Sequence, residues 1–219
     1  LILFIQLLKK SYTNKCNTLL HVDLDLAFWQ QYLQLNKNVK KAISQIDIKL
    51  TSVAYSFMMG DFDTVIKKLG KHLVRRIIRR NIKTFFESYL MRSTVLTDPD
   101  LSRGELEGRL NELTITDPTL AEKTRKVCLA LYDLTIAHQS NDYFEDLSND
   151  FKYQQLEIIY YQALNATLKG DQHRANELFH KLVSEDESLY IVRKAKKYLR
   201  DEAVICKSSN RNRELIERT

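Results

Sequence analysis

The sequence predicts an all-α fold of about 10–11 helices, and three observations lead to this prediction. The 219 residues include only five Gly and two Pro, whereas a β-sandwich or barrel of this size needs many tight turns built from these residues. The chain is rich in Leu, Lys, Glu and Gln, which favour helices. Apolar residues such as Ile43, Ile46 and Leu50 recur at intervals of three and four, as in an amphipathic helix.

Helix starts and stops divide the chain into segments. Asp23 or Asp25 can cap the second helix, because a carboxylate accepts bonds from the free N–H groups of a first turn. The pairs Asp98-Pro99 and Asp117-Pro118 predict two further starts, because Pro fits the first helical turn. The expected helices cover residues 1–20, 28–35, 39–59, 61–69, 74–96, 98–113, 117–137, 143–147, 150–164, 171–182 and 188–199.

Three turns share one pattern. They lie at Gly60-Asp61, Asn141-Asp142 and Gly170-Asp171. In each, the first residue is Gly or Asn, the types that best tolerate a positive φ, and we expect it to end a helix. The Asp that follows can cap the next helix at once. The pattern predicts that each such turn folds two helices into an antiparallel pair.

These turns and their flanking residues resemble the tetratricopeptide repeat. The best match comprises Ala163, Gly170, Asp171, Ala175 and Phe179, where small residues let two helices approach. A partial match carries Val65 in place of the small residue, and it comprises Gly60, Asp61, Phe62 and Leu69. Asn141, Asp142 and Tyr143 match only at the turn. The start Trp-x-x-Leu-Gly and the terminal Pro of the family are absent.

The resemblance covers roughly residues 39–72 and 119–199. It implies a right-handed array of antiparallel helix pairs whose concave groove binds a peptide or a partner helix. We therefore expect a non-enzymatic scaffold for protein–protein interaction. The alternatives are a soluble regulatory sensor that binds a peptide and an enzyme of unknown reaction.

The predicted domains are an amino-terminal helix over 1–20, a single helical domain over 21–206 and a polar tail over 207–219. Residues 1–8 are apolar apart from Gln6, and Lys9 and Lys10 follow them. Since a membrane crossing needs about 20 apolar residues, this stretch could be only the end of a longer anchor. The chain would then be the cytoplasmic part of a membrane-anchored protein. The other interpretation is a first core helix of a soluble domain.

Charge is unevenly distributed, with 16 basic and 6 acidic side chains in residues 1–96 against 18 and 22 in the remainder. A basic segment free of acidic residues carries most of this excess. It includes Lys67, Lys71, Arg75, Arg76, Arg79, Arg80 and Lys83. Like charges four residues apart repel on a helix, so the segment predicts an acidic partner or an anionic membrane surface. The alternative is neutralisation within the chain by Asp100, Glu105, Glu107 or Glu112.

Tyrosines gather in the last third of the chain, where they could line a peptide groove because the ring packs while the hydroxyl reaches water. The candidates are Tyr153, Tyr160, Tyr161 and Tyr190. Ordinary packing between helices is the competing interpretation. No sequence motif for catalysis, for a metal or for a cofactor is present, and the basic residues are not interleaved with exposed aromatics as nucleic-acid binding requires. We expect no catalytic residue, metal or cofactor.

Overall fold

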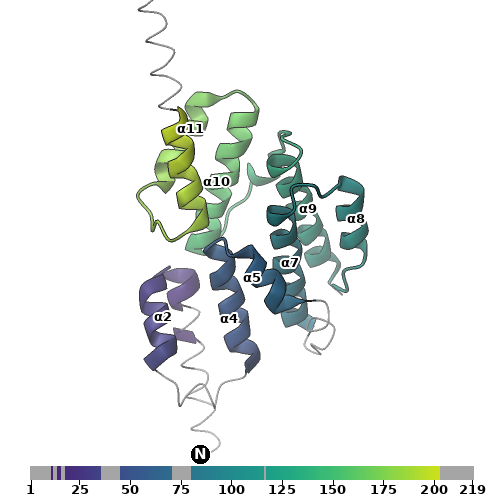
Figure 1. The fold of residues 1–219 in the computed structure, drawn as a ribbon, viewed down its shortest axis with the longest axis vertical. Helices are drawn as coiled ribbons and strands as arrows, with labels where there is room; N and C mark the ends of the chain where they lie inside the picture. The colour runs from purple at the N-terminus through teal and green to yellow at the C-terminus, as the bar shows by residue number, and fades with distance from the viewer. Residues whose placement is uncertain are drawn as a thin grey trace, which may run out of the picture.

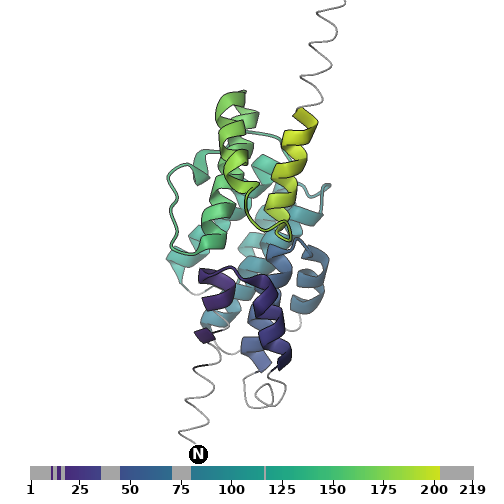
Figure 2. The same ribbon diagram turned by 90° about the vertical axis from the view of Figure 1, so that its left-hand side faces the viewer.

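The computed structural model describes residues 11, 14–15, 18–35, 45–70, 80–115 and 117–202. Every regular element within these residues is a helix and none is a strand, which confirms the predicted all-α class. Figure 1 and Figure 2 show α2 and α4 at one end of the molecule and α10 and α11 at the other, with α7, α8 and α9 alongside.

The described residues form a short π-helix, eight α-helices of varied length, a 3₁₀-helix between α9 and α10, and a last helix over 190–202. They are η1 (Thr18–Val22), α2 (Leu26–Leu35), α4 (Gln45–Met58), α5 (Phe62–Leu69), α7 (Arg80–Thr97), α8 (Arg103–Asn111), α9 (Pro118–Thr135), η2 (Asp142–Phe144), α10 (Lys152–Leu168) and α11 (Gln172–Leu182). The predicted segments 1–20 and 207–219 lie, apart from a few residues before 20, outside the described part of the chain.

Gly60 and Gly170 form the same helix-ending turn. Their φ angles are +74° and +78°, in the left-handed region that suits glycine. After α4, the N–H of Gly60 donates to the Phe57 carbonyl and the N–H of Asp61 donates to the Ser56 carbonyl, both at 2.9 Å. The turn after α10 repeats the same two bonds, to the carbonyls three and five residues back. This is the Schellman motif, and it confirms the predicted helix ends.

The aspartates of these turns begin the next helices. Oδ1 of Asp61 accepts from the backbone N–H of Thr64 at 3.2 Å, and Oδ1 of Asp171 accepts from that of Arg174 at 3.1 Å. Each carboxylate therefore caps its helix, as predicted, one residue after the turn glycine. Consequently α4 and α5 are joined with no loop between the two caps, and so are α10 and α11.

The third turn differs from the prediction. Helix α9 ends at Thr135, and His138, with φ of +50°, takes the left-handed conformation in this connection. Asn141 is extended, with φ of −146°, and its side chain caps the 3₁₀-helix by accepting from the Tyr143 N–H. The Asn141 N–H in turn donates to Oδ1 of Asn165, which is fully buried in α10. Asn141 therefore anchors a longer loop to α10 instead of closing a tight helical turn, and Asp142 is not the cap.

The start of α8 also differs. Asp98-Pro99 lies in a turn, and α8 begins at Arg103 with Ser102 as its cap. Ser102 and Glu105 form a capping box, in which each side chain bonds the backbone N–H of the other. This reciprocal pair satisfies two free N–H groups, whereas Asp98 would satisfy one. Asp117-Pro118 does begin α9 as predicted, with Pro118 in the first turn.

The helices pack as neighbouring groups. Helix α5 contacts both α4 and α7, α7 contacts α9, and α10 contacts α11. Buried apolar residues run continuously through these contacts and form one core. Cys128 lies in it, and burial raises the pKa of its thiol to about 12, so it acts as a small apolar side chain.

The last helix returns to the first described hairpin. Nη2 of Arg193 donates to the carbonyl oxygen of Met59 at 2.7 Å, at the end of α4. Tyr190 packs edge-to-face on Phe62 with 5.0 Å between ring centroids, and it also covers Gly60. We call these contacts the clasp. In a linear helical array each repeat contacts only its neighbours, so the clasp is an additional long-range closure.

Arg92 connects three helices at the centre of the core. From α7, its Nη2 donates to Oε1 of Glu157 in α10, and its guanidinium carbon lies 4.6 Å from the ring centroid of Phe57 in α4. The two side chains of the ion pair are 15% and 8% exposed. Burial alone would disfavour the Arg92 charge, but Glu157 together with Tyr161 and Tyr89 outweighs it and raises the pKa of Arg92. The guanidinium therefore stays charged inside the core.

Alanine substitutions at the two turn glycines should differ in cost. For Gly170→Ala we expect a loss of about 1–2 kcal/mol of unfolding free energy, because a Cβ is strained at positive φ while no atom lies within 4 Å of it. Gly60→Ala should lose about 1–3 kcal/mol more, because overpacking adds to the strain: its Cβ would lie 2.5 Å from Cδ2 of Tyr190. Urea denaturation of both variants measures the difference, and equal losses would contradict the close approach of Tyr190.

Breaking the Arg92–Glu157 pair should cost more than replacing it. Arg92→Met leaves the Glu157 carboxylate buried without a partner, so we expect a loss of about 3–5 kcal/mol of unfolding free energy. The double variant Arg92→Met/Glu157→Leu should lose less than Arg92→Met alone, because no uncompensated charge remains. Chemical denaturation of the two variants tests this, and a double variant less stable than the single one would show that the ion pair is not the source of the loss.

Candidate functional site

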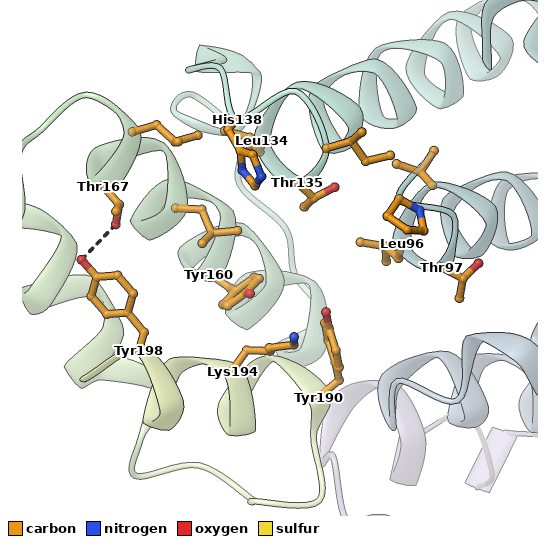
Figure 3. A pocket seen from close by; sticks show the side chains of 15 residues that line it. Leu96, Thr97, Leu134, Thr135, His138, Tyr160, Thr167, Tyr190, Lys194 and Tyr198 are labelled. Atoms are coloured by element: carbon orange, nitrogen blue, oxygen red, sulfur yellow. Dashed lines mark hydrogen bonds between the residues drawn. The ribbon is translucent and has the colours of Figure 1, made fainter. Parts of the chain in front are cut away.

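A groove of about 590 Å³ lies between the carboxyl ends of α7 and α9 and the facing sides of α10 and the helix 190–202. Figure 3 shows its walls, with Leu96 and Thr97 on one side and Tyr198, Lys194 and Tyr190 on the other. Its lining comprises Val95, Leu96, Thr97, Pro99, Leu134, Thr135, Ile136, His138, Tyr160, Leu164, Thr167, Leu168, Tyr190, Lys194 and Tyr198.

The helices meet here because α7 and α9 run side by side in the same direction. Early residues of both helices line a second cavity, described below, and late residues of both line the groove. Helix α10 supplies Tyr160, Leu164 and Leu168 at intervals of four, so one face of this helix forms the floor. Packed helices supply twelve of the fifteen lining residues, and the connections after α7 and α9 supply Pro99, Ile136 and His138.

The lining exposes more apolar than polar surface: seven of its fifteen residues are aliphatic, and the others are three Tyr, three Thr, His138 and Lys194. Tyr160 is buried, and burial raises the pKa of its hydroxyl, which therefore stays protonated at neutral pH. Tyr198 is half-buried, its ring centroid lies 4.2 Å from that of Phe179, and the Thr167 hydroxyl donates to its oxygen at 3.3 Å. This bond is the dashed line in Figure 3. Such apolar walls with a few placed hydroxyls are typical of a binding site.

Two cationic or potentially cationic residues border the groove. Nζ of Lys194 lies 5.4 Å from the ring centroid of Tyr190. His138 is exposed at the end of the α9 connection, in the left-handed conformation noted above. A non-glycine residue at positive φ is uncommon and occurs often at functional positions. None of the described lining residues is acidic.

The structure brings together only two of the four predicted groove tyrosines. Tyr160 and Tyr190 line the groove. Tyr153 and Tyr161 are 3% and 1% exposed, are not among its lining residues, and pack in the core near Arg92 and Glu157. The packing interpretation therefore describes Tyr153 and Tyr161. Both lie on α10, as Tyr160 does, and the spacing of these tyrosines does not show which of them face the groove and which face the core.

Sequence reasoning counted Tyr198 among the tyrosines of the last third but left it out of the four groove candidates, and it missed Lys194 and His138. Tyr198 and Lys194 had a detectable signal, because Tyr190, Lys194 and Tyr198 follow one another at intervals of four on a single helix and so share a face. His138 had none, because its place depends on the path of the α9 connection. The repeat-turn residues, in contrast, lie outside the lining and serve the fold.

Most of the predicted basic segment falls outside the described residues. This applies to Lys71, Arg75, Arg76 and Arg79, whereas Arg80 is the first residue of α7. Lys67 is exposed on α5 and Lys83 is half-buried on α7. Of the acidic residues offered as neutralising partners, Glu105 bonds its own cap residue Ser102 and Glu107 pairs with Arg103 at 3.3 Å. The role of the basic segment stays a prediction.

A second cavity, of about 330 Å³, lies between α7, α9, α10 and the loop after η2. Arg92 and Glu157 line its inner end, and the exposed Leu120 and Lys123 of α9 line its rim. Nε of Arg92 and Oε1 of Gln154 are buried without a hydrogen-bond partner among the described residues. Polar side chains are more numerous in the lining of this cavity than in that of the groove.

Searches for known chemistry and for known relatives gave no assignment. In the described part of the chain, no three His, Cys, Asp or Glu side chains are grouped so as to hold a metal ion. None of the helices described there has both the length and the low polarity needed to cross a membrane. Comparison of the chain with protein-family models, with curated proteins and with solved structures found no significant match.

Proposed function

We propose that this chain is a non-enzymatic interaction domain that binds a peptide segment of a partner protein in the groove. The observation that carries the proposal is the lining itself: aliphatic side chains from α7, α9 and α10, together with the rings and hydroxyls of Tyr160, Tyr190 and Tyr198. Tyrosine supplies a large apolar contact and a polar group on one rigid side chain, a combination enriched at protein interfaces.

The dimensions support a peptide as occupant. A groove of about 590 Å³ is within the range of sites that enclose several side chains or a small molecule. Its walls are helices fixed by the common core, so little ordering of the protein would accompany binding. Less ordering means a smaller entropic cost, and this favours measurable affinity for a short segment.

The likeness to tetratricopeptide repeats adds to this proposal. The hairpins α4–α5 and α10–α11 share a Schellman turn, an aspartate cap and, in the second, a buried small residue at Ala175. Helical hairpins of this kind form arrays with concave binding surfaces. We propose the same use of the surface here, with a right-handed arrangement of the pairs and with the clasp as an addition particular to this chain.

Peptide selection tests the proposed groove. A displayed library of random peptides of about 12 residues, which can reach about 40 Å when extended, is selected on the wild-type chain. Leu96→Arg places a long cationic side chain in the groove, and we expect it to weaken binding of the selected peptides at least about tenfold, or about 1.4 kcal/mol. Isothermal titration calorimetry gives the affinities, and circular dichroism confirms that the variant is folded.

Leu120→Arg is the matched control, because Leu120 is 40% exposed and lines the second cavity instead. We expect this variant to bind the selected peptides with unchanged affinity. If Leu120→Arg abolished binding and Leu96→Arg did not, the groove would not be the binding site. Failure to select any peptide on the wild type would also contradict the proposal.

A further inference from the structure

Lys194 differs from two lysines near it, which form ion pairs. On the same helix, Nζ of Lys196 bonds Oε1 of Glu187, and on the neighbouring α10, Nζ of Lys152 lies 2.7 Å from Oε2 of Glu185. Within the described residues, Lys194 has no ion pair, and its Nζ lies over the Tyr190 ring. Lys194 thus brings a positive charge to a groove whose lining contains no carboxylate.

A charge in such a place has an energetic consequence. Lys194 is exposed, so water reaches its ammonium group, while the Tyr190 ring and the apolar lining lie on one side of it. An anionic group bound beside Lys194 would therefore gain an ion pair that strengthens binding a few-fold, as exposed pairs do. Since no described lining residue is acidic, no carboxylate of the groove would compete with or repel that anion.

A hydroxyl donor lies beside the ammonium group. Tyr190 is one turn before Lys194 on the helix, and Figure 3 shows the Tyr190 hydroxyl and Lys194 Nζ on the same wall, both directed into the groove. Burial raises the pKa of Tyr190, so its hydroxyl keeps its proton at neutral pH and can donate. An ammonium group and a phenol side by side can each donate a hydrogen bond to one carboxylate, which has two acceptor oxygens.

We propose that the bound segment carries an aspartate or glutamate side chain, whose carboxylate accepts hydrogen bonds from Lys194 and Tyr190. The apolar residue next to it in the segment then contacts the aliphatic wall formed by Leu134, Leu164 and Leu168. This inference rests on the proposed peptide-binding function and specifies the chemistry of the peptide. A carboxylate suits the site better than a phosphate, because its single charge matches the single ammonium group, whereas a phosphate would bring nearly two charges.

The experiment uses the peptides selected on the wild-type chain. We expect them to be enriched in Asp or Glu beside an apolar residue. Each is then synthesised in its acidic form and with that residue changed to Asn or Gln, which keeps the shape and removes the charge. The amide form should bind about two- to fivefold more weakly, as for the loss of one exposed ion pair.

Variants of the chain assign the effect to Lys194. Lys194→Met keeps an apolar stem of similar length, and we expect it to bind the acidic and amide peptides with the same, weaker affinity. Lys197→Met is the control, because Lys197 is exposed on the same helix and is not a lining residue; it should keep the preference for acidic peptides. Tyr190→Phe retains the ring that contacts Gly60 and should weaken binding of the acidic peptide about threefold.

The outcomes separate this inference from the function on which it rests. If Leu96→Arg abolishes binding but Lys194→Met binds acidic and amide peptides as the wild type does, the groove stands and the carboxylate contact is overturned. A phosphoserine peptide that binds more tightly than its glutamate form would overturn the choice of a carboxylate. If no peptide is selected, or if Leu96→Arg leaves binding unchanged, both proposals fall together.

Discussion

The buried charge of Arg92 is the constraint around which the helices are arranged. Its guanidinium must find both an anion and packing partners, because an unpaired charge is costly in a core. Glu157 of α10 supplies the anion, and Phe57 of α4 supplies an aromatic face for a cation–π contact. A guanidinium has a fixed plane and directed donors, so these contacts set orientation as well as proximity. Apolar packing alone would hold the same helices together but would restrict the angles between them less.

The position of the groove follows from these contacts of Arg92. Arg92 lies about one turn before Val95 and Leu96 along α7, and Glu157 lies about one turn before Tyr160 along α10. The Arg92–Glu157 contact holds α7 and α10 together at these two residues, and so it sets the separation of the groove walls that begin one turn later. Helix α9 runs beside α7 in the same direction and ends with Leu134 and Ile136 in the lining. The groove thus lies at the carboxyl ends of α7 and α9, beside α10.

Local signals made part of this fold predictable. Gly60-Asp61 and Gly170-Asp171 determine their turns through bonds within six residues, so the sequence alone predicts both the bend and the cap. Contacts between distant segments were not predictable in the same way. Asn141 is extended because Asn165, 24 residues later, accepts its N–H. Tyr153 and Tyr161 were predicted to line the groove, but they lie on the face of α10 that packs near Arg92. The sequence alone does not show which face of α10 meets Arg92. The groove also includes His138, whose position follows from the path of the α9 connection.

The clasp joins one wall of the groove to the α4–α5 hairpin. Tyr190 contributes one side of its ring to the hairpin at Gly60 and also borders the groove, while Arg193 holds the same helix to the end of α4. The groove wall and the α4–α5 turn therefore share one aromatic side chain, so a change of side-chain size at Tyr190 alters both surfaces at once.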